Sequence, residues 1–127
     1  MSKSVIYSEQ APAPIGPYSQ AIRVKDTLYV SGQIALLAGS GELVKGTIEE
    51  ETRQVMKNLG AILTAAGMDF GNVAKCTIFI KDMNDFGAIN GVYGSFFSDQ
   101  QPPARETVEV SRLPKDVRVE ISCIAVA

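Results

Sequence analysis

The sequence predicts an α+β protein in which a mixed β-sheet carries two helices on one face. Three observations lead to this prediction. Five segments alternate apolar and polar residues as strands do, two longer segments repeat apolar residues at helical spacing, and their order is β-β-α-β-α-β-β. The chain of 127 residues is long enough for a substantial core, so we expect residues 1–127 to form one domain.

The first two strands are expected at residues 20–24 and 28–34, joined as a hairpin. Residues 8–18, which precede them, contain three prolines and a glycine, and this composition predicts an ordered loop. Gly32 interrupts the second strand, which indicates a bulge or a close approach of a ligand to the backbone.

A helix is predicted over residues 47–66. Thr47 as N-cap and Glu50 three residues later form the pattern of a capping box. Apolar residues then recur at helical spacing, and Gly67 provides a stop.

A third strand is expected at residues 73–81, and a second helix from residue 82 or 84 to residue 98. Glycines at three positions weaken this helix by up to about 1 kcal/mol each relative to alanine. Gly87, Gly91 and Gly94 indicate either the close approach of another backbone or simple tolerance at a surface.

The last two strands are expected at residues 106–111 and 117–126, on either side of a turn. One face of the final strand is apolar throughout, whereas the other is polar at one end and apolar at the other. Because the two helices cover only one face of the sheet, a partly apolar second face predicts burial against another copy of the chain. We therefore expect a homo-oligomer.

The composition excludes several classes of function. The chain is 46% hydrophobic, has a net charge of −2 and contains no long run of cations, which argues against nucleic-acid or membrane binding as its main activity. Its apolar stretches are shorter than the roughly 20 residues that cross a bilayer. Residues 1–7 lack an apolar signal core, so we expect a cytoplasmic protein.

The chain contains no histidine, which removes Ser-His-Asp and Cys-His catalysis and histidine metal sites. Phosphate-cradling loops, dinucleotide fingerprints and metal-ligand clusters are also absent from the sequence, so we expect no cofactor and no metal. Cys76 and Cys123 fall in predicted strands. They could be reactive thiols or form a disulfide, but buried small side chains in a reducing compartment are the favoured interpretation.

Two charged residues are candidates for a small-molecule site. Arg105 follows Pro102-Pro103 at the entrance of a strand, where its planar guanidinium could bind a carboxylate or phosphate; a structural ion pair is the alternative. Glu120 lies within an apolar strand and could instead be the partner of Arg118 or Lys115.

A tight hairpin at residues 113–116 would place Glu120 opposite Glu109. Arg105 would then lie about 13 Å from Glu120, at about 3.3 Å per residue, so the two side chains could not meet. A site that uses both needs a ligand that spans part of this gap or a contribution from a neighbouring subunit.

Three further positions could contribute to such a site. Tyr18 offers a hydroxyl on the predicted loop, although it could simply anchor that loop. Ser31 and Gly32 mark the interrupted strand, where a ligand could approach the backbone. Asn90 lies in a helix, where its amide implies either an exposed face or a polar contact.

The segment 103–121 closely resembles the C-terminal signature of the RidA/YjgF family, the reactive-intermediate (imine/enamine) deaminases. Residues 11–12, 15–20, 31–34 and 81–86 match further family motifs. The resemblance implies a chorismate-mutase-like fold that assembles as a homotrimer, with sites at the subunit interfaces. It also implies hydrolysis of 2-iminoalkanoates such as 2-iminobutanoate and 2-iminopropanoate, and of their enamine tautomers, to 2-oxoacids and ammonia, without cofactor or metal.

The resemblance also implies roles for the candidate residues. Arg105 would hold the substrate carboxylate and Glu120 would position or activate water. Tyr18, Ser31, Gly32 and Asn90 would line the pocket. The family usually has a small residue and then cysteine after the arginine, where this chain has Glu106 and Thr107. Thr107 lacks the thiol but keeps a backbone N–H for the substrate, and alternation predicts that Glu106 points away from Arg105.

Two other functions remain open. The protein could be a non-catalytic trimer that binds 2-oxoacids or regulates a partner, as relatives named as purine or translation regulators imply. It could also be an endoribonuclease, against which the acidic balance and the absence of histidine both count.

Overall fold

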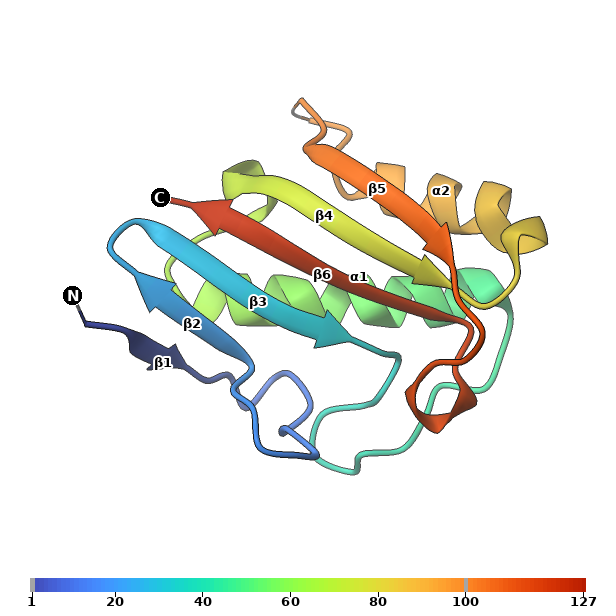
Figure 1. Ribbon diagram of the computed structural model, residues 1–127, viewed down its shortest axis with the longest axis horizontal. Coiled ribbons are helices and arrows are strands. Elements are labelled where there is room, and N and C mark those ends of the chain that lie inside the picture. Colours follow the sequence, from blue (N-terminus) through green and yellow to red (C-terminus); the bar gives the residue numbers. More distant parts are fainter. Residues whose placement is uncertain (1, 100) are drawn as a thin grey trace.

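A six-stranded mixed sheet forms one layer of the molecule, and two helices lie behind it in the view of Figure 1. The computed structural model describes residues 2–99 and 101–127. The strand order is β1-β2-β3-β6-β4-β5. The strands are β1 (Ser4–Ile6), β2 (Ala21–Val24), β3 (Thr27–Gln33), β4 (Val73–Ile80), β5 (Ala104–Glu109) and β6 (Val119–Val126). The predicted α+β architecture is confirmed.

The long helix α1 (Ile48–Ala65) begins at the predicted capping box. The Thr47 hydroxyl accepts a hydrogen bond from the Glu50 N–H at 3.1 Å, and the Glu50 carboxylate accepts one from the Thr47 N–H at 3.4 Å. The helix ends before Gly67, whose φ of +74° suits a residue without a side chain. The local pattern therefore determines both ends of α1.

The second helix is shorter than predicted. A 3₁₀ turn (Met83–Asp85) precedes α2 (Phe86–Ser95). A side chain at the three helical glycines would meet nothing within 4 Å in the described chain. These glycines therefore do not admit another backbone of the described chain, and tolerance at an open surface is the better explanation.

The core lies between the helices and one face of the sheet, and both helices contribute to it. The strand β4 shows the alternation clearly: Cys76, Ile78 and Ile80 are buried on the helix side, while Thr77 and Phe79 face the opposite side. The prediction that both helices cover one face is therefore confirmed.

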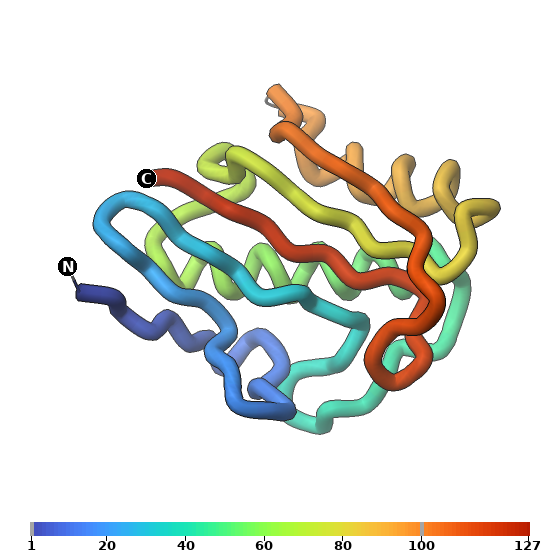
Figure 2. The backbone as a smooth tube through the Cα atoms, viewed as in Figure 1, coloured from blue at the N-terminus to red at the C-terminus, as the bar shows by residue number. Residues whose placement is uncertain are grey.

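The sheet differs from the prediction in two ways. The three-residue strand β1, which pairs with β2, was not foreseen. The strands β5 and β6 do not form the expected hairpin, because β4 lies between them: β5 pairs with β4 in parallel, and β6 pairs with β4 and β3 in antiparallel fashion. Figure 2 shows the chain leaving β5 at the sheet edge and returning through a loop to run as β6 between β3 and β4.

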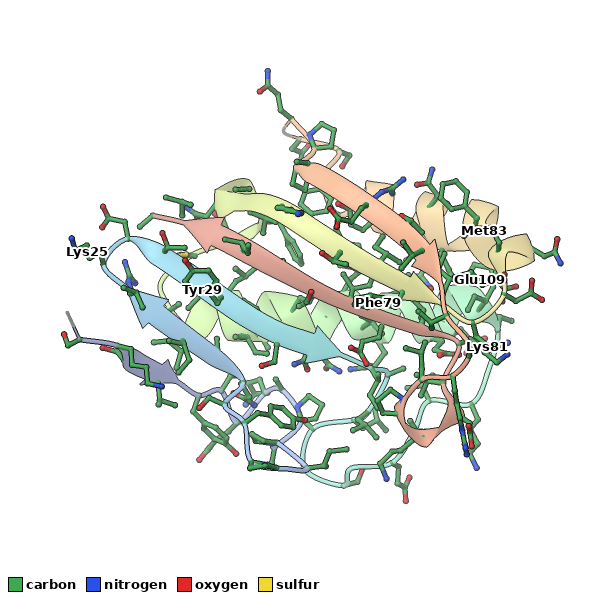
Figure 3. All side chains as sticks on the ribbon, in the orientation of Figure 1. Lys25, Tyr29, Phe79, Lys81, Met83 and Glu109 are labelled. Atoms are coloured by element: carbon green, nitrogen blue, oxygen red, sulfur yellow. The ribbon has the colours of Figure 1, made fainter. Side chains whose placement is uncertain are left out.

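The face of the sheet opposite the helices carries many apolar side chains, and no helix of the described chain covers it. Figure 3 shows Tyr29 on β3 and Phe79 on β4 at this face. Register places four exposed large side chains here: Val5, Tyr29, Val108 and Val126, each between 43% and 63% exposed. We call this surface the open face; several exposed large apolar side chains on one face are typical of an interface.

Candidate active site

Arg105 lies within β5, not before it, and its side chain is directed toward α2. It is opposite the buried Cys76 in the sheet, which places it on the helix side. The guanidinium donates a 2.6 Å hydrogen bond to the Asn90 amide oxygen. Its central carbon also lies 5.0 Å from the ring centre of Tyr93 and 5.6 Å from that of Phe86.

No carboxylate neutralises Arg105 within the part of the chain that the structure describes. The ion pairs found there join Lys75 to Glu106, Arg112 to Asp116 and Arg118 to Glu51. The alternative of a structural ion pair for Arg105 is therefore not observed. A partly buried guanidinium without an acid partner retains N–H groups that can bind an anion.

The strand that carries Arg105 also offers a free backbone donor two residues later, at Thr107. The Val110 N–H donates to the Ile80 carbonyl in the parallel ladder at 2.8 Å. By alternation, the backbone N–H of Thr107 then points away from β4, toward the free edge of β5. The Thr107 side chain lies on the Arg105 side of the sheet, and its hydroxyl is buried without a hydrogen-bond partner in the described chain.

Glu106 points to the opposite face, as alternation predicted. It forms a 2.9 Å ion pair with Lys75 on the open face. Glu106 stands where the family motif usually has a small residue. Because it points to the other face, it does not alter the surroundings of Arg105.

Glu120 lies on the open face, because its partner on β4 is Phe79. It lines a cavity of about 340 Å³ together with Tyr18, Ser31 and Gly32. Burial raises the pKa of the Glu120 carboxyl above its usual value. The suggested alternative, a pair with Arg118 or Lys115, is not observed: Arg118 pairs with Glu51 at 2.7 Å.

The Glu120 carboxylate lies so close to the backbone of β3 that it explains why residue 32 is glycine. The register between β3 and β6 shifts between Val30 and Gln33, so the predicted irregularity is present. A side chain at Gly32 would fall on the Glu120 carboxylate. The glycine is therefore needed for the close approach of this acid to the backbone of β3.

Gln20 organises the loop that forms one wall of the cavity. This side chain is only 1% exposed. Its amide oxygen accepts from the Ser8 N–H at 2.6 Å, and its amide nitrogen donates to the carbonyls of Ser8 at 3.0 Å and Pro12 at 2.9 Å. Tyr18 closes the same loop locally, because its hydroxyl accepts a 3.3 Å hydrogen bond from the Ile15 N–H.

The predicted site residues therefore form two groups on opposite faces of one sheet. The first group, on the helix side, is Arg105, Asn90 and Thr107. The second group, at the cavity of the open face, is Tyr18, Ser31, Gly32 and Glu120. One chain alone does not bring the two groups together.

Sequence reasoning missed three residues that shape these groups. Phe86 and Tyr93 lie four residues before and three residues after Asn90, so all three share one face of α2. The spacing that puts these residues on one helix face can be seen in the sequence. That this face contacts Arg105 cannot. Gln20 directly precedes β2, and nothing local distinguishes it from a surface polar residue.

The two cysteines are free, buried and directly opposite each other on β4 and β6. Burial raises the pKa of both thiols, that of Cys123 to about 12. They are therefore protonated small hydrophobic side chains, as predicted.

Within residues 2–99 and 101–127, no helix has the length and apolarity needed to span a membrane. The same residues contain no group of three acids or cysteines arranged to hold a metal ion.

Comparison with known proteins identifies close relatives. Residues 8–127 match the sequence profile of the family described as Endoribonuclease L-PSP. The 2-iminobutanoate/2-iminopropanoate deaminase of Mus musculus is 52% identical over 124 residues, covering 98% of this chain and 91% of the mouse protein. A RutC family protein of Pyrococcus horikoshii is 54% identical over 123 residues, covering 97% of each.

Solved structures of related proteins match this chain over nearly its whole length. A conserved Rid family protein of Yersinia pestis has a TM-score of 0.96 at 48% identity, covering 99% of this chain and all of that one. The E. coli protein TdcF with bound serine has a TM-score of 0.94 at 40% identity, covering 98% of each chain.

Proposed function

Because the chain belongs to the Endoribonuclease L-PSP family, which includes the YjgF and Rid proteins, we propose that it hydrolyses 2-iminoalkanoates and their enamine tautomers. The products are 2-oxoacids and ammonia, and 2-iminobutanoate and 2-iminopropanoate are the expected substrates. The observation that carries this proposal is Arg105, a partly buried cation with no acid partner in the described chain. The mouse deaminase at 52% identity supports the same chemistry.

Arg105 binds the substrate carboxylate through its free N–H groups, assisted by the backbone N–H of Thr107 at the strand edge. Glu120 holds a water against the imine carbon. As the water oxygen bonds to this carbon, the Glu120 carboxylate accepts a proton and then returns it to the nitrogen. The hydroxyl proton then passes to the nitrogen as the C=O bond forms, so that the C–N bond breaks and ammonia leaves. The imine carbon is already electrophilic, so orientation supplies most of the acceleration.

A site that uses both groups on one small ligand needs residues from more than one subunit. We propose a homotrimer in which the open face is buried, and in which Arg105 of one subunit meets the Glu120 cavity of its neighbour. The exposed apolar side chains of the open face and the opposite orientations of Arg105 and Glu120 support this assembly. Light scattering after gel filtration tests it: a monomer at micromolar concentration would contradict it.

The free, buried thiols are compatible with a reducing compartment and support the proposed cytoplasmic location.

A coupled assay tests the activity directly. A pyridoxal-phosphate-dependent dehydratase or an amino-acid oxidase generates the imine in situ, and the loss of the imine is followed with and without the protein. The wild-type protein accelerates hydrolysis, and Arg105→Ala abolishes the acceleration. Undiminished acceleration by Arg105→Ala would exclude the proposed role of this residue.

Two comparisons each support an alternative function that can be tested with the same variants. The serine-bound relative favours a carboxylate-binding protein, for which ligand would bind without any acceleration of hydrolysis. The family description favours ribonuclease activity, which a cleavage assay on nuclease-free preparations tests. Cleavage that persists in Arg105→Ala at wild-type rate would assign it to a contaminant or to another site.

A further inference from the structure

We propose that Phe86 and Tyr93 are positioning residues that hold the Arg105 guanidinium ready for a carboxylate without neutralising its charge. This inference rests on the proposed function in one respect only, namely that Arg105 binds the carboxylate of the ligand. The aromatic rings, together with the Asn90 amide, are here called the α2 cradle.

The α2 cradle fixes the guanidinium in two ways. The two rings lie 5.0 and 5.6 Å from the central carbon of the Arg105 guanidinium, which is within the range of a cation–π interaction. Asn90 accepts one N–H at 2.6 Å and so restricts rotation of the group. Both contacts leave most of the five N–H donors of arginine available.

The chemical nature of the α2 cradle is the essential point. An aspartate or glutamate in the place of either ring would also hold the arginine, but it would compete with the substrate carboxylate for the same donors. Ring faces attract the cation through their quadrupole and carry no net charge. The cradle therefore orders Arg105 before the ligand arrives, which lowers the entropy lost on binding.

One hydrogen bond links the start of α2 to β5, and the cradle residue Tyr93 is buried in the core. The Glu109 carboxylate, at the end of β5, accepts a 2.7 Å hydrogen bond from the Met83 N–H, just before α2; Figure 3 labels both residues. Tyr93 is 4% exposed and also packs on the Phe97 ring at 5.0 Å. The helix that carries the cradle is thus anchored at its start and in the core.

The role of Tyr93 resides in its ring, not in its hydroxyl. The hydroxyl is buried next to the Cys76 thiol, a weak partner, and makes no hydrogen bond of good geometry within the described chain. Burial raises the pKa of Tyr93, so the group stays protonated at neutral pH and does not act as a base. Phenylalanine at this position should therefore preserve the cradle, whereas leucine should not.

The test measures binding of 2-oxobutanoate, a carboxylate that needs no turnover, by isothermal titration calorimetry. We expect Phe86→Leu and Tyr93→Leu to raise the Kd by about 5- to 20-fold each, whereas Tyr93→Phe stays within about twofold of the wild type. The control is Phe96→Leu, at the C-terminal cap of α2. This change removes a ring that packs on Phe70 and that is not one of the two rings facing Arg105. It should lower the melting temperature and leave the Kd unchanged.

Several outcomes would overturn the inference. These are an unchanged Kd in Phe86→Leu and Tyr93→Leu, an equal rise in Phe96→Leu, or no binding of 2-oxobutanoate by the wild-type protein. If Tyr93→Leu fails to fold, Phe86→Leu decides alone, because Phe86 is 37% exposed and its loss leaves the core intact. Binding is read without catalysis, so the result stands whether or not the wild-type protein hydrolyses imines.

Discussion

Arg105 and Glu120 point to opposite sides of the same sheet. Arg105 pairs with Cys76 and Glu120 with Phe79, three residues apart on the intervening strand β4. This offset and two strand spacings separate their Cα atoms by about 14 Å. A site that uses both side chains on one small ligand must therefore combine the helix side of one chain with the open face of another.

The pH dependence of activity should report Glu120. Burial raises the pKa of this carboxyl, and in the proposed mechanism the carboxylate form accepts the proton from water. We expect kcat/KM to fall about tenfold per pH unit below this raised pKa. In Glu120→Gln the rate should be low and this limb of the profile absent. If the fall in kcat/KM at low pH persists in Glu120→Gln, a group other than Glu120 causes it.

The same shift affects stability with a definite sign. The folded state binds the Glu120 proton more tightly than the unfolded chain does, so its stabilising contribution is complete below the ordinary pKa of glutamate. It is lost as the pH rises through the raised pKa. Urea unfolding at several pH values should show Glu120→Gln gaining stability relative to the wild type as the pH rises. Equal stability at all pH values would contradict this account.

A side chain at position 32 should impair activity. In Gly32→Ala the new methyl group displaces the Glu120 carboxylate, and we expect kcat/KM to fall about 10- to 100-fold. Gly91→Ala is the matched control, because its methyl group meets nothing within 4 Å among the residues that the structure describes. That control should gain up to about 1 kcal/mol of stability and keep its activity. Full activity in Gly32→Ala would mean that the position of Glu120 is not critical.

The buried hydroxyl of Thr107 should be dispensable. It has no partner in the described chain, so Thr107→Val should raise the free energy of unfolding by about 1 kcal/mol. Activity should persist through the backbone N–H at the strand edge. Thr52→Val is the contrasting variant: its hydroxyl donates to the Ile48 carbonyl at 2.8 Å, and its loss should lower stability. A loss of stability in Thr107→Val would reveal a partner in the assembled protein.

Gln20 should matter for both stability and substrate binding. Gln20→Leu leaves buried backbone groups of the 8–18 loop without partners, and we expect it to cost about 2–4 kcal/mol. The KM should rise because this loop carries Tyr18 and one wall of the cavity. The exposed Gln10, changed to leucine, serves as the control and should alter neither quantity. An unchanged KM in Gln20→Leu would show that the 8–18 loop does not contribute to substrate binding.

Local signals in the sequence predicted most elements but not their pairing. The capping box at Thr47 and the alternation along β4 act between near neighbours, so they are visible in a single sequence. The insertion of β4 between β5 and β6 depends on contacts across many residues, and alternation says nothing about which strand lies beside which. The three-residue strand β1 is too short to show a pattern.

The candidate site shows the same limit. Arg105 and Glu120 could be selected by residue type and by the resemblance of their segment. The expected separation of about 13 Å was derived from a hairpin between β5 and β6, which the structure does not contain because β4 lies between them. Their opposite orientation was not anticipated, because the assumed hairpin placed both on one face. The α2 cradle was missed because it joins a helix to a strand edge through contacts that only the tertiary structure creates.

Complementation between two inactive variants tests the shared site most directly. Arg105→Ala and Glu120→Ala chains, each inactive alone, are co-refolded in equal amounts, and imine hydrolysis is measured. In a closed ring, a site that takes Arg105 from one subunit and Glu120 from the next is intact at about a quarter of the interfaces, so about a quarter of wild-type activity should return. No recovery in well-mixed oligomers would contradict the shared site.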